Sequence, residues 1–122
     1  MTSLAAPAVQ VQSLRKDFVR RKKRFPALKE ISFEIPRGEC VAILGQNGSG
    51  KSTLVRLLST LLLPDGGAAR IFGSDVVKDA KRVRRLVNRV SVEASFFKKM
   101  SAAENLGYAA RFYGMTPGET RR

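Results

Sequence analysis

The stretch that decides the fold reads Gly45-Gln46-Asn47-Gly48-Ser49-Gly50-Lys51-Ser52, and Thr53 follows it. It matches the phosphate-binding pattern G-x-x-x-x-G-K-[ST]. Glycines let the backbone curl so that successive N–H groups point inward and form a concave site for phosphate oxygens. A helix beginning near Lys51 adds unpaired amides and a partial positive charge at the same place. We expect Lys51 to reach the β- and γ-phosphates and the Ser52 hydroxyl to ligate Mg²⁺.

The segments around this loop predict an α/β fold. Residues 40–44 form a continuous apolar run, which is expected for a strand covered on both faces in a parallel sheet, with Cys40 buried in it. Residues 51–62 place leucines on one helical stripe, which Pro64 is expected to stop. Two alternating segments, 8–14 and 31–35, predict antiparallel strands ahead of the loop.

The remaining segments predict shorter elements. The charged residues 15–24 and Phe25-Pro26 are expected to form a long exposed connection. A short strand is expected at 70–72, a basic helix over 79–87 and extended structure at 90–92. Ser101 and Glu104 have the spacing of a capping box, in which each side chain bonds the other's backbone amide. They predict a helix that closes near Gly114 and Pro117.

Composition excludes several classes of protein. A chain of 122 residues has the size of one domain, and no apolar stretch approaches the roughly 20 residues that cross a bilayer. The single cysteine excludes an internal disulfide and fits a reducing compartment, and the absence of histidine excludes imidazole chemistry. The net charge of +13 is concentrated in residues 15–24 and 78–89. These runs are typical of a solvated surface, with phosphate or lipid-headgroup contact as the alternative.

Residues 45–53 resemble the Walker A loop of an ABC-transporter ATP-binding subunit. Residues 27–39 resemble that family's approach to the loop, 63–67 its segment after the first helix, and 104–106 the start of its helical region. The resemblance implies a partial P-loop NTPase core with an antiparallel β subdomain. It also implies that residues 1–122 are the N-terminal portion of a nucleotide-binding domain, truncated before the signature motif and the second acidic motif. Residues 73–77 and 83–85 are similar to the drug- and antibiotic-export branch.

The resemblance implies ATP and Mg²⁺ as ligands, with Lys51 as the catalytic residue of the loop. An aromatic residue ahead of the strand hairpin stacks on adenine in this family; Phe18 occupies that place, and Phe25 is the competing aromatic. The family has a glutamine that contacts Mg²⁺ where this chain reads Val90-Ser-Val-Glu-Ala94. Glu93 is the expected substitute, while one residue of alignment slack would put Val92 there, and a plain loop residue is the alternative. The nucleotide-binding set is therefore Phe18, Gly45, Gln46, Asn47, Gly48, Ser49, Gly50, Lys51, Ser52 and Thr53, with Ser52 and Glu93 for the metal.

The function implied is that of an ATPase that drives export. It would act with membrane-spanning transporter subunits and a second ATP-binding domain, and would be cytoplasmic and peripheral at the inner face of the membrane, without nucleic acid. A soluble ABC ATPase acting on ribosomes or nucleic acid is one alternative, favoured by the basic charge. Another P-loop enzyme, such as a nucleotide kinase, and a non-functional truncated remnant are the others. The fragment alone is expected to bind nucleotide weakly and to lack turnover.

Overall fold

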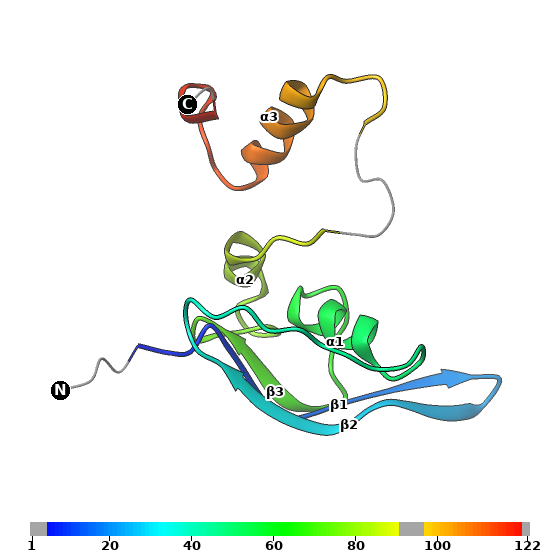
Figure 1. Cartoon of the computed structure of the whole chain (residues 1–122). Coiled ribbons are helices and arrows are strands. Elements are labelled where there is room, and N and C mark those ends of the chain that lie inside the picture. Colours follow the sequence, from blue (N-terminus) through cyan, green and yellow to red (C-terminus); the bar gives the residue numbers. More distant parts are fainter. Residues whose placement is uncertain (1–4, 91–96, 121–122) are drawn as a thin grey trace. The chain divides into compact units, whose positions relative to one another are not determined.

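The computed structural model describes residues 5–90 and 97–120 of the chain. Two compact units, residues 1–87 and residues 88–122, make up the molecule, and Figure 1 labels most of their elements. Among the described residues, the strands lie in the first unit together with helices α1 and α2, and the second unit holds α3 and α4. The extended segment expected at 90–92 falls largely outside the described residues.

An antiparallel sheet forms the base of the first unit, with its described strands in the order β2-β1-β3-β4. β1 pairs with β2 on one side and with β3 on the other, so that Val11 lies opposite both Phe33 and Ala69. The antiparallel strands expected from alternation are confirmed as parts of β1 and β2, and the short strand expected at 70–72 begins earlier, in β3. The bounds are β1 (Val9–Arg20), β2 (Lys23–Ile35), β3 (Gly66–Ile71) and β4 (Ser74–Asp75).

The expectation that residues 15–24 form an exposed connection is wrong, because β1 and β2 continue through them as one long hairpin (Figure 1). Cross-strand pairing runs to Arg20 and Lys23. Arg21 and Lys22 make the turn with φ of 51° and 62°, the left-handed pair that matches the twist of a two-residue hairpin. Pro26 lies within β2, which is an edge strand and tolerates a missing N–H. The high charge of residues 15–24 is typical of a loop and did not indicate that they pair as strands.

The core lies between the sheet and two helices, α1 (Lys51–Leu58) and α2 (Ala80–Leu86). α2 confirms the basic helix expected over 79–87. Leu14 from β1, Leu57 from α1 and Val83 from α2 are fully buried, so that all three elements meet in one cluster. The buried apolar residues are Val11, Leu14, Leu28, Leu54, Leu57, Ala69, Ile71, Val76 and Val83.

Helix α1 is shorter than the sequence predicted, because it ends at Leu58 instead of residue 62. Thr60 adopts a left-handed φ of 66°, and the N–H of Leu61 donates to the carbonyl of Arg56 at 2.8 Å. This is the hydrogen bonding of a helix C-terminus closed by a left-handed residue. Leu61 consequently leaves the predicted stripe and is 59% exposed.

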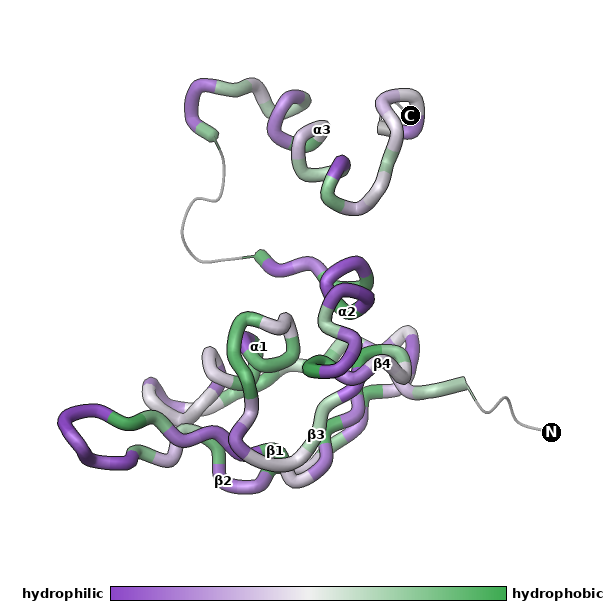
Figure 2. Tube along the Cα trace, turned by 180° about the vertical axis from the view of Figure 1, so that it is seen from behind, coloured by the Kyte–Doolittle hydropathy of each residue, from purple (hydrophilic) through white to green (hydrophobic). Residues whose placement is uncertain are grey.

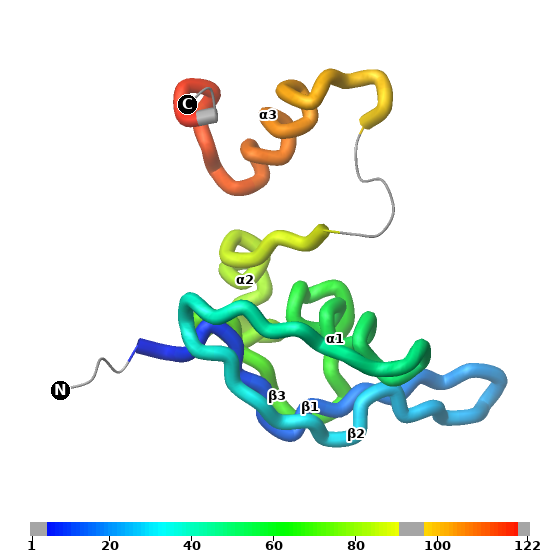
Figure 3. Tube along the Cα trace, viewed as in Figure 1, coloured from blue at the N-terminus to red at the C-terminus, as the bar shows by residue number. Residues whose placement is uncertain are grey.

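The prediction of a buried strand at residues 40–44 is also wrong. The segment has no regular secondary structure, Cys40 is exposed and Leu44 is 92% exposed. Figure 3 shows it as the path that leads from the end of β2 to α1. A strand needs a neighbour for its backbone hydrogen bonds, and no strand of the described part of the chain pairs with these residues. Apolar composition alone therefore does not make this segment a strand.

The second unit contains α3 (Ala102–Phe112), which begins where the sequence predicted. The Ser101 hydroxyl oxygen accepts a hydrogen bond from the Glu104 N–H at 3.1 Å, and this half of the capping box is confirmed. The Glu104 carboxylate instead accepts from the Ser101 hydroxyl at 3.1 Å. Gly114, with φ of 78°, follows the helix as expected.

A further helix, α4 (Pro117–Thr120), follows in the second unit. The sequence predicted that Pro117 only closes the preceding helix, but it begins this one, because proline suits the first position of a helix. The Thr116 N–H donates to Glu119 Oε2 at 2.7 Å, and the Glu119 N–H donates to Thr116 Oγ1 at 3.3 Å. Thr116 and Glu119 thus cap the start of α4.

Candidate functional site

The glycine loop joins α1 at Gly50, where the backbone has a φ of 99°. A Cβ atom at this position would lie 2.5 Å from the carbonyl oxygen of Ala27 and 2.7 Å from Leu28 Cδ2. Both neighbours belong to β2, so Gly50 is the point where the loop rests on the sheet. The left-handed conformation and the close approach each require glycine here.

At the start of the loop, Gly45 lies against the side chain of Ser49. A Cβ there would lie 2.6 Å from Ser49 Oγ, because the chain folds back within a few residues. The Ser49 N–H donates to the Gln46 carbonyl at 3.1 Å and holds that turn. The loop is therefore curled, as the motif predicted.

The first turn of α1 carries open backbone amides. The N-cap is Gly50, which has no side chain to cap the helix, and no acidic residue lies in the first turn. Within the described residues, the amides of Lys51, Ser52 and Thr53 have no protein acceptor. Unpaired amides at the positive end of a helix dipole form an anion-binding environment.

The Lys51 side chain folds back over the loop. Its Nζ donates to the carbonyl oxygens of Gly45 and, at 3.2 Å, of Gln46. These contacts keep a positive charge beside the open amides of α1. The lysine and the helix start thus contribute to the same positive electrostatic potential.

A cavity of about 320 Å³ lies beside the loop. Phe18 from β1 and Ala27 from β2 line it together with residues 47–53, and none of these described residues carries a carboxylate. The structure thus brings Phe18 to the same cavity as Lys51 and Ser52. Gly45 and Gln46 do not line it, and Phe25 lines a different cavity farther out on the hairpin.

Two contributors to this region were missed by sequence reasoning. Ala27 lines the cavity and accommodates Gly50 through its carbonyl oxygen, which no side-chain pattern reveals. Asp65 Oδ2 accepts the Asp17 N–H at 2.7 Å, next to Phe18 in β1. That backbone hydrogen bond holds the pKa of Asp65 below its usual value, and Lys16 adds to the effect. The sequence around this acidic residue, between Pro64 and Gly66, indicates only a turn.

Of the two residues predicted to bind the metal, one lies within the described residues and the other lies outside them. Ser52 lies exposed in the first turn of α1, whereas Glu93 and the alternative Val92 lie outside the described residues. Over residues 5–90 and 97–120, no group of three or more metal-binding side chains comes together. Protein sites for Mg²⁺ commonly supply one or two groups and leave the rest to phosphate oxygens and water. The Ser52 hydroxyl beside a phosphate loop fits a metal that arrives with its nucleotide.

A glycine loop of the pattern G-x-x-x-x-G-K-[ST] that leads into a helix with open amides is the phosphate-binding element of P-loop nucleotide-binding domains. The family model described as ABC transporter matches residues 28–121. The chain belongs to this family of ATP-binding, ATP-hydrolysing proteins, which confirms the resemblance and the predicted fold class. No described helix is both long and apolar enough to cross a membrane.

The alignments with individual relatives cover nearly all of this chain. The doxorubicin resistance ATP-binding protein DrrA of Mycobacterium tuberculosis is 37% identical over 115 residues, which are 94% of this chain and 34% of that protein. The sulfate/thiosulfate import ATP-binding protein CysA of Brucella melitensis is 37% identical over 113 residues, which are 93% of this chain and 29% of that protein. The chain thus spans about a third of the length of these curated relatives.

Solved structures agree with the fold. The dimeric structure of a post-hydrolysis state of the ATP-binding cassette MJ0796, bound to ADP and Pi, superposes with a TM-score of 0.76 at 26% identity. The match covers 93% of this chain and 52% of that one. The fold described above is therefore that of about half of an ABC ATPase domain.

Proposed function

We propose that this chain is the nucleotide-binding portion of a subunit that couples MgATP binding and hydrolysis to export across a membrane. The observation that carries the proposal is the cavity shared by Phe18, Lys51 and the open amides of α1. It offers an aromatic surface for a base at one side and a positive environment for phosphates at the other. The triphosphate lies along residues 47–53, which line this cavity, with adenine against Phe18.

Each part of the loop has a distinct role in this proposal. The backbone amides of residues 47, 48 and 50 and of the first turn of α1 cradle the phosphates. Lys51 exchanges its contacts with the Gly45 and Gln46 carbonyls for phosphate oxygens, which are stronger acceptors because they are charged. The Phe18 ring holds the base without hydrogen bonds that would select it strictly.

The Ser52 hydroxyl is the proposed protein ligand of Mg²⁺, and Glu93 is the proposed second contact. The proposal for Glu93 is tested by titrating Mg²⁺ against nucleotide affinity in wild type and Glu93→Ala. A higher Mg²⁺ requirement in the variant supports the contact. Identical titrations would remove Glu93 from the metal site.

Hydrolysis and transport belong to the complete subunit in this proposal. Among the described residues that line the cavity, none has an acidic side chain or an imidazole that could orient the attacking water. A second ATP-binding domain is the proposed partner, supported by the dimeric form of MJ0796. Membrane-spanning subunits are the others, and they would place the protein at the cytoplasmic face of the membrane.

Import is the second candidate function. The relative named for doxorubicin resistance favours export, but the one named for sulfate/thiosulfate import has the same identity to this chain, 37%. The direction is tested in inside-out membrane vesicles that contain the complete transporter. ATP-driven accumulation inside such vesicles indicates export, whereas ATP-driven release from preloaded vesicles indicates import.

The nucleotide site itself is tested with Lys51→Ala and titration of MgATP. Loss of a charge-assisted hydrogen bond is worth about 1.5–3 kcal/mol, so we expect affinity to fall by roughly 10- to 100-fold. Lys81→Ala is the matched control, because Lys81 is an exposed lysine of α2. If both variants bind MgATP as wild type does, the phosphate assignment is wrong.

A further inference from the structure

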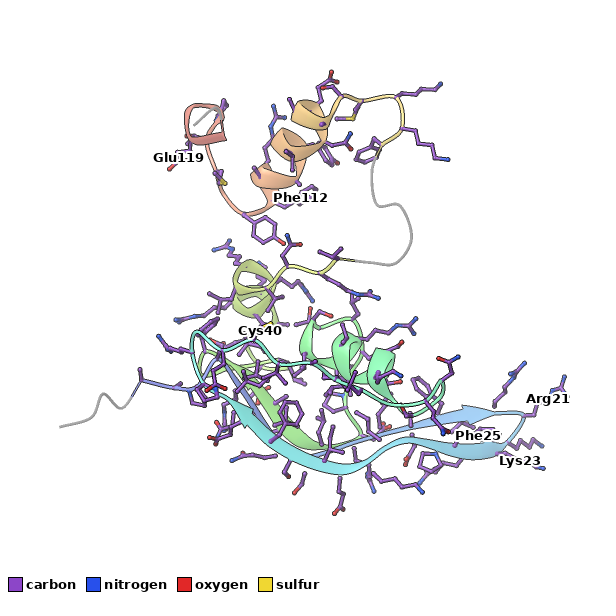
Figure 4. The ribbon with its side chains drawn as sticks, viewed as in Figure 1. Arg21, Lys23, Phe25, Cys40, Phe112 and Glu119 are labelled. Atoms are coloured by element: carbon purple, nitrogen blue, oxygen red, sulfur yellow. The ribbon has the colours of Figure 1, made fainter. Side chains whose placement is uncertain are left out.

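The far end of the β1–β2 hairpin is strongly basic. Arg20, Arg21, Lys22, Lys23 and Arg24 are five consecutive cations, and Phe25 follows them. All six side chains are exposed, and residues 20–25 are named here the hairpin tip. Figure 4 shows Arg21, Lys23 and Phe25 at the end of the projecting hairpin, and Figure 2 shows the tip as mainly hydrophilic.

These charges are nearly uncompensated. Arg24 Nη1 lies 4.0 Å from Asp17 Oδ2, and no other tip cation has a carboxylate within ion-pair distance in the described part of the chain. Like charges crowded onto one turn repel each other and oppose the folding of the hairpin. An anionic surface bound at the tip would remove that repulsion.

The turn itself keeps cations at the outermost positions despite a conformational cost. Arg21 and Lys22 have φ of 51° and 62°, where glycine and asparagine are the usual residues. The left-handed conformation costs a residue with a Cβ about 1–2 kcal/mol. Glycine would relieve the strain but would remove two of the five charges.

Apolar side chains accompany the cations. Phe25 is 51% exposed and Val19 is 69% exposed. Arg20, Arg21, Lys23 and Phe25 line a cavity of about 400 Å³ at the tip. A phosphate group can approach the cations there, while the Phe25 ring meets less polar parts of the same ligand. Cations beside exposed aromatic and aliphatic groups are the combination that interfacial membrane binding uses.

We propose that the hairpin tip binds the surface of a membrane that contains anionic phospholipid. The proposal rests on the function proposed above, because a transport subunit works beside a membrane. The compact tip favours a lipid surface over nucleic acid, since single-stranded nucleic acid is bound along an extended basic groove with successive stacking residues. Here a two-residue turn and the strand ends beside it present all five charges.

The test measures how the full chain partitions onto vesicles. Vesicles of phosphatidylcholine mixed with phosphatidylglycerol are compared with vesicles of phosphatidylcholine alone. The combined variant Arg21→Gln, Lys22→Gln, Lys23→Gln removes three tip charges. Since each basic residue near an anionic surface contributes about 1 kcal/mol, we expect roughly 100-fold weaker partitioning onto the anionic vesicles.

The matched control removes three exposed cations from α2 with Lys81→Gln, Arg82→Gln and Arg85→Gln. It lowers the net charge equally, and we expect it to partition nearly as wild type does. Equal losses in both variants would show that net charge alone drives binding and would overturn the proposal. Tip-dependent binding to a single-stranded RNA oligonucleotide, with none to anionic vesicles, would overturn it in favour of nucleic acid.

The two proposals can fail separately. The tip variant is expected to bind MgATP as wild type does, and Lys51→Ala is expected to partition normally onto anionic vesicles. Far-UV circular dichroism on every variant confirms that the fold persists. A variant with lost structure is replaced by Phe25→Ser, which keeps all five charges; partitioning onto anionic vesicles equal to that of wild type would then contradict the role of the aromatic ring.

Discussion

The Asp65 carboxylate accepts a hydrogen bond from the backbone N–H of Asp17 at 2.7 Å. Asp65 lies between α1 and β3, whereas Asp17 precedes Phe18 in β1. Lys16 Nζ lies 3.6 Å from the same carboxylate and 5.5 Å from the centre of the Phe18 ring. The connection between α1 and β3 therefore holds in place the part of β1 that contains Phe18, which lines the loop cavity.

Asp65 makes the stability of the fold depend on pH. The Asp17 N–H lowers the pKa of Asp65 in the folded chain. The ionised Asp65 carboxylate therefore stabilises the fold above the pKa that Asp65 has in the unfolded chain. This stabilisation is lost as the pH falls through the lower pKa that Asp65 has in the folded chain. We expect stability to decline from about pH 4 downward. Urea unfolding of wild type and Asp65→Asn across this range should show a weaker decline in the variant, with Asp79→Asn as control. Parallel pH profiles would contradict the assignment.

Gly50 should tolerate no side chain. Gly50→Ala combines a strained φ of 99° with contacts of 2.5 Å and 2.7 Å, and we expect a loss of about 3 kcal/mol in urea unfolding. Gly38→Ala is the matched control, because Gly38 has a φ of 80° and a Cβ added there would meet no atom within 4 Å. It should lose only about 1–2 kcal/mol for its conformation. Equal losses would show that loop–sheet contact contributes nothing.

The early end of α1 predicts unequal effects along its leucines. Leu57 is fully buried and Leu61 is 59% exposed. Leu57→Ala should therefore cost about 2–5 kcal/mol in the free energy of unfolding, and Leu61→Ala no more than about 0.5 kcal/mol. A large loss for Leu61→Ala would indicate that the helix continues to residue 62, as the leucine spacing suggested.

Phe18 is predicted to contribute to base binding and not to phosphate binding. Stacking of a base on an aromatic ring is worth about 1–3 kcal/mol, so Phe18→Ala should weaken ATP binding by roughly 5- to 150-fold. Binding of inorganic triphosphate should change little, because the phosphate loop remains intact. Phe25→Ala is the control, since Phe25 does not line the loop cavity. Equal losses for ATP and triphosphate would remove Phe18 from the base site.

The sequence by itself determined the features that depend on neighbouring residues. Glycine spacing predicted the curled loop before α1, and Ser101 predicted the start of α3. Alternation predicted the inner parts of β1 and β2. In each case the residues that set the backbone conformation lie within a few positions of one another. A short stretch of sequence is therefore enough to predict the local structure.

Only the tertiary structure decided which distant residues meet. The hairpin register pairs Phe18 directly with Phe25, yet Phe18 lines the loop cavity and Phe25 lines the cavity at the tip. Residues 40–44 have the composition of a strand but no paired strand among the described residues. Strand pairing, cavities and the Asp65–Asp17 hydrogen bond join residues far apart in the chain. Such contacts depend on the packing of whole elements, which local composition does not fix.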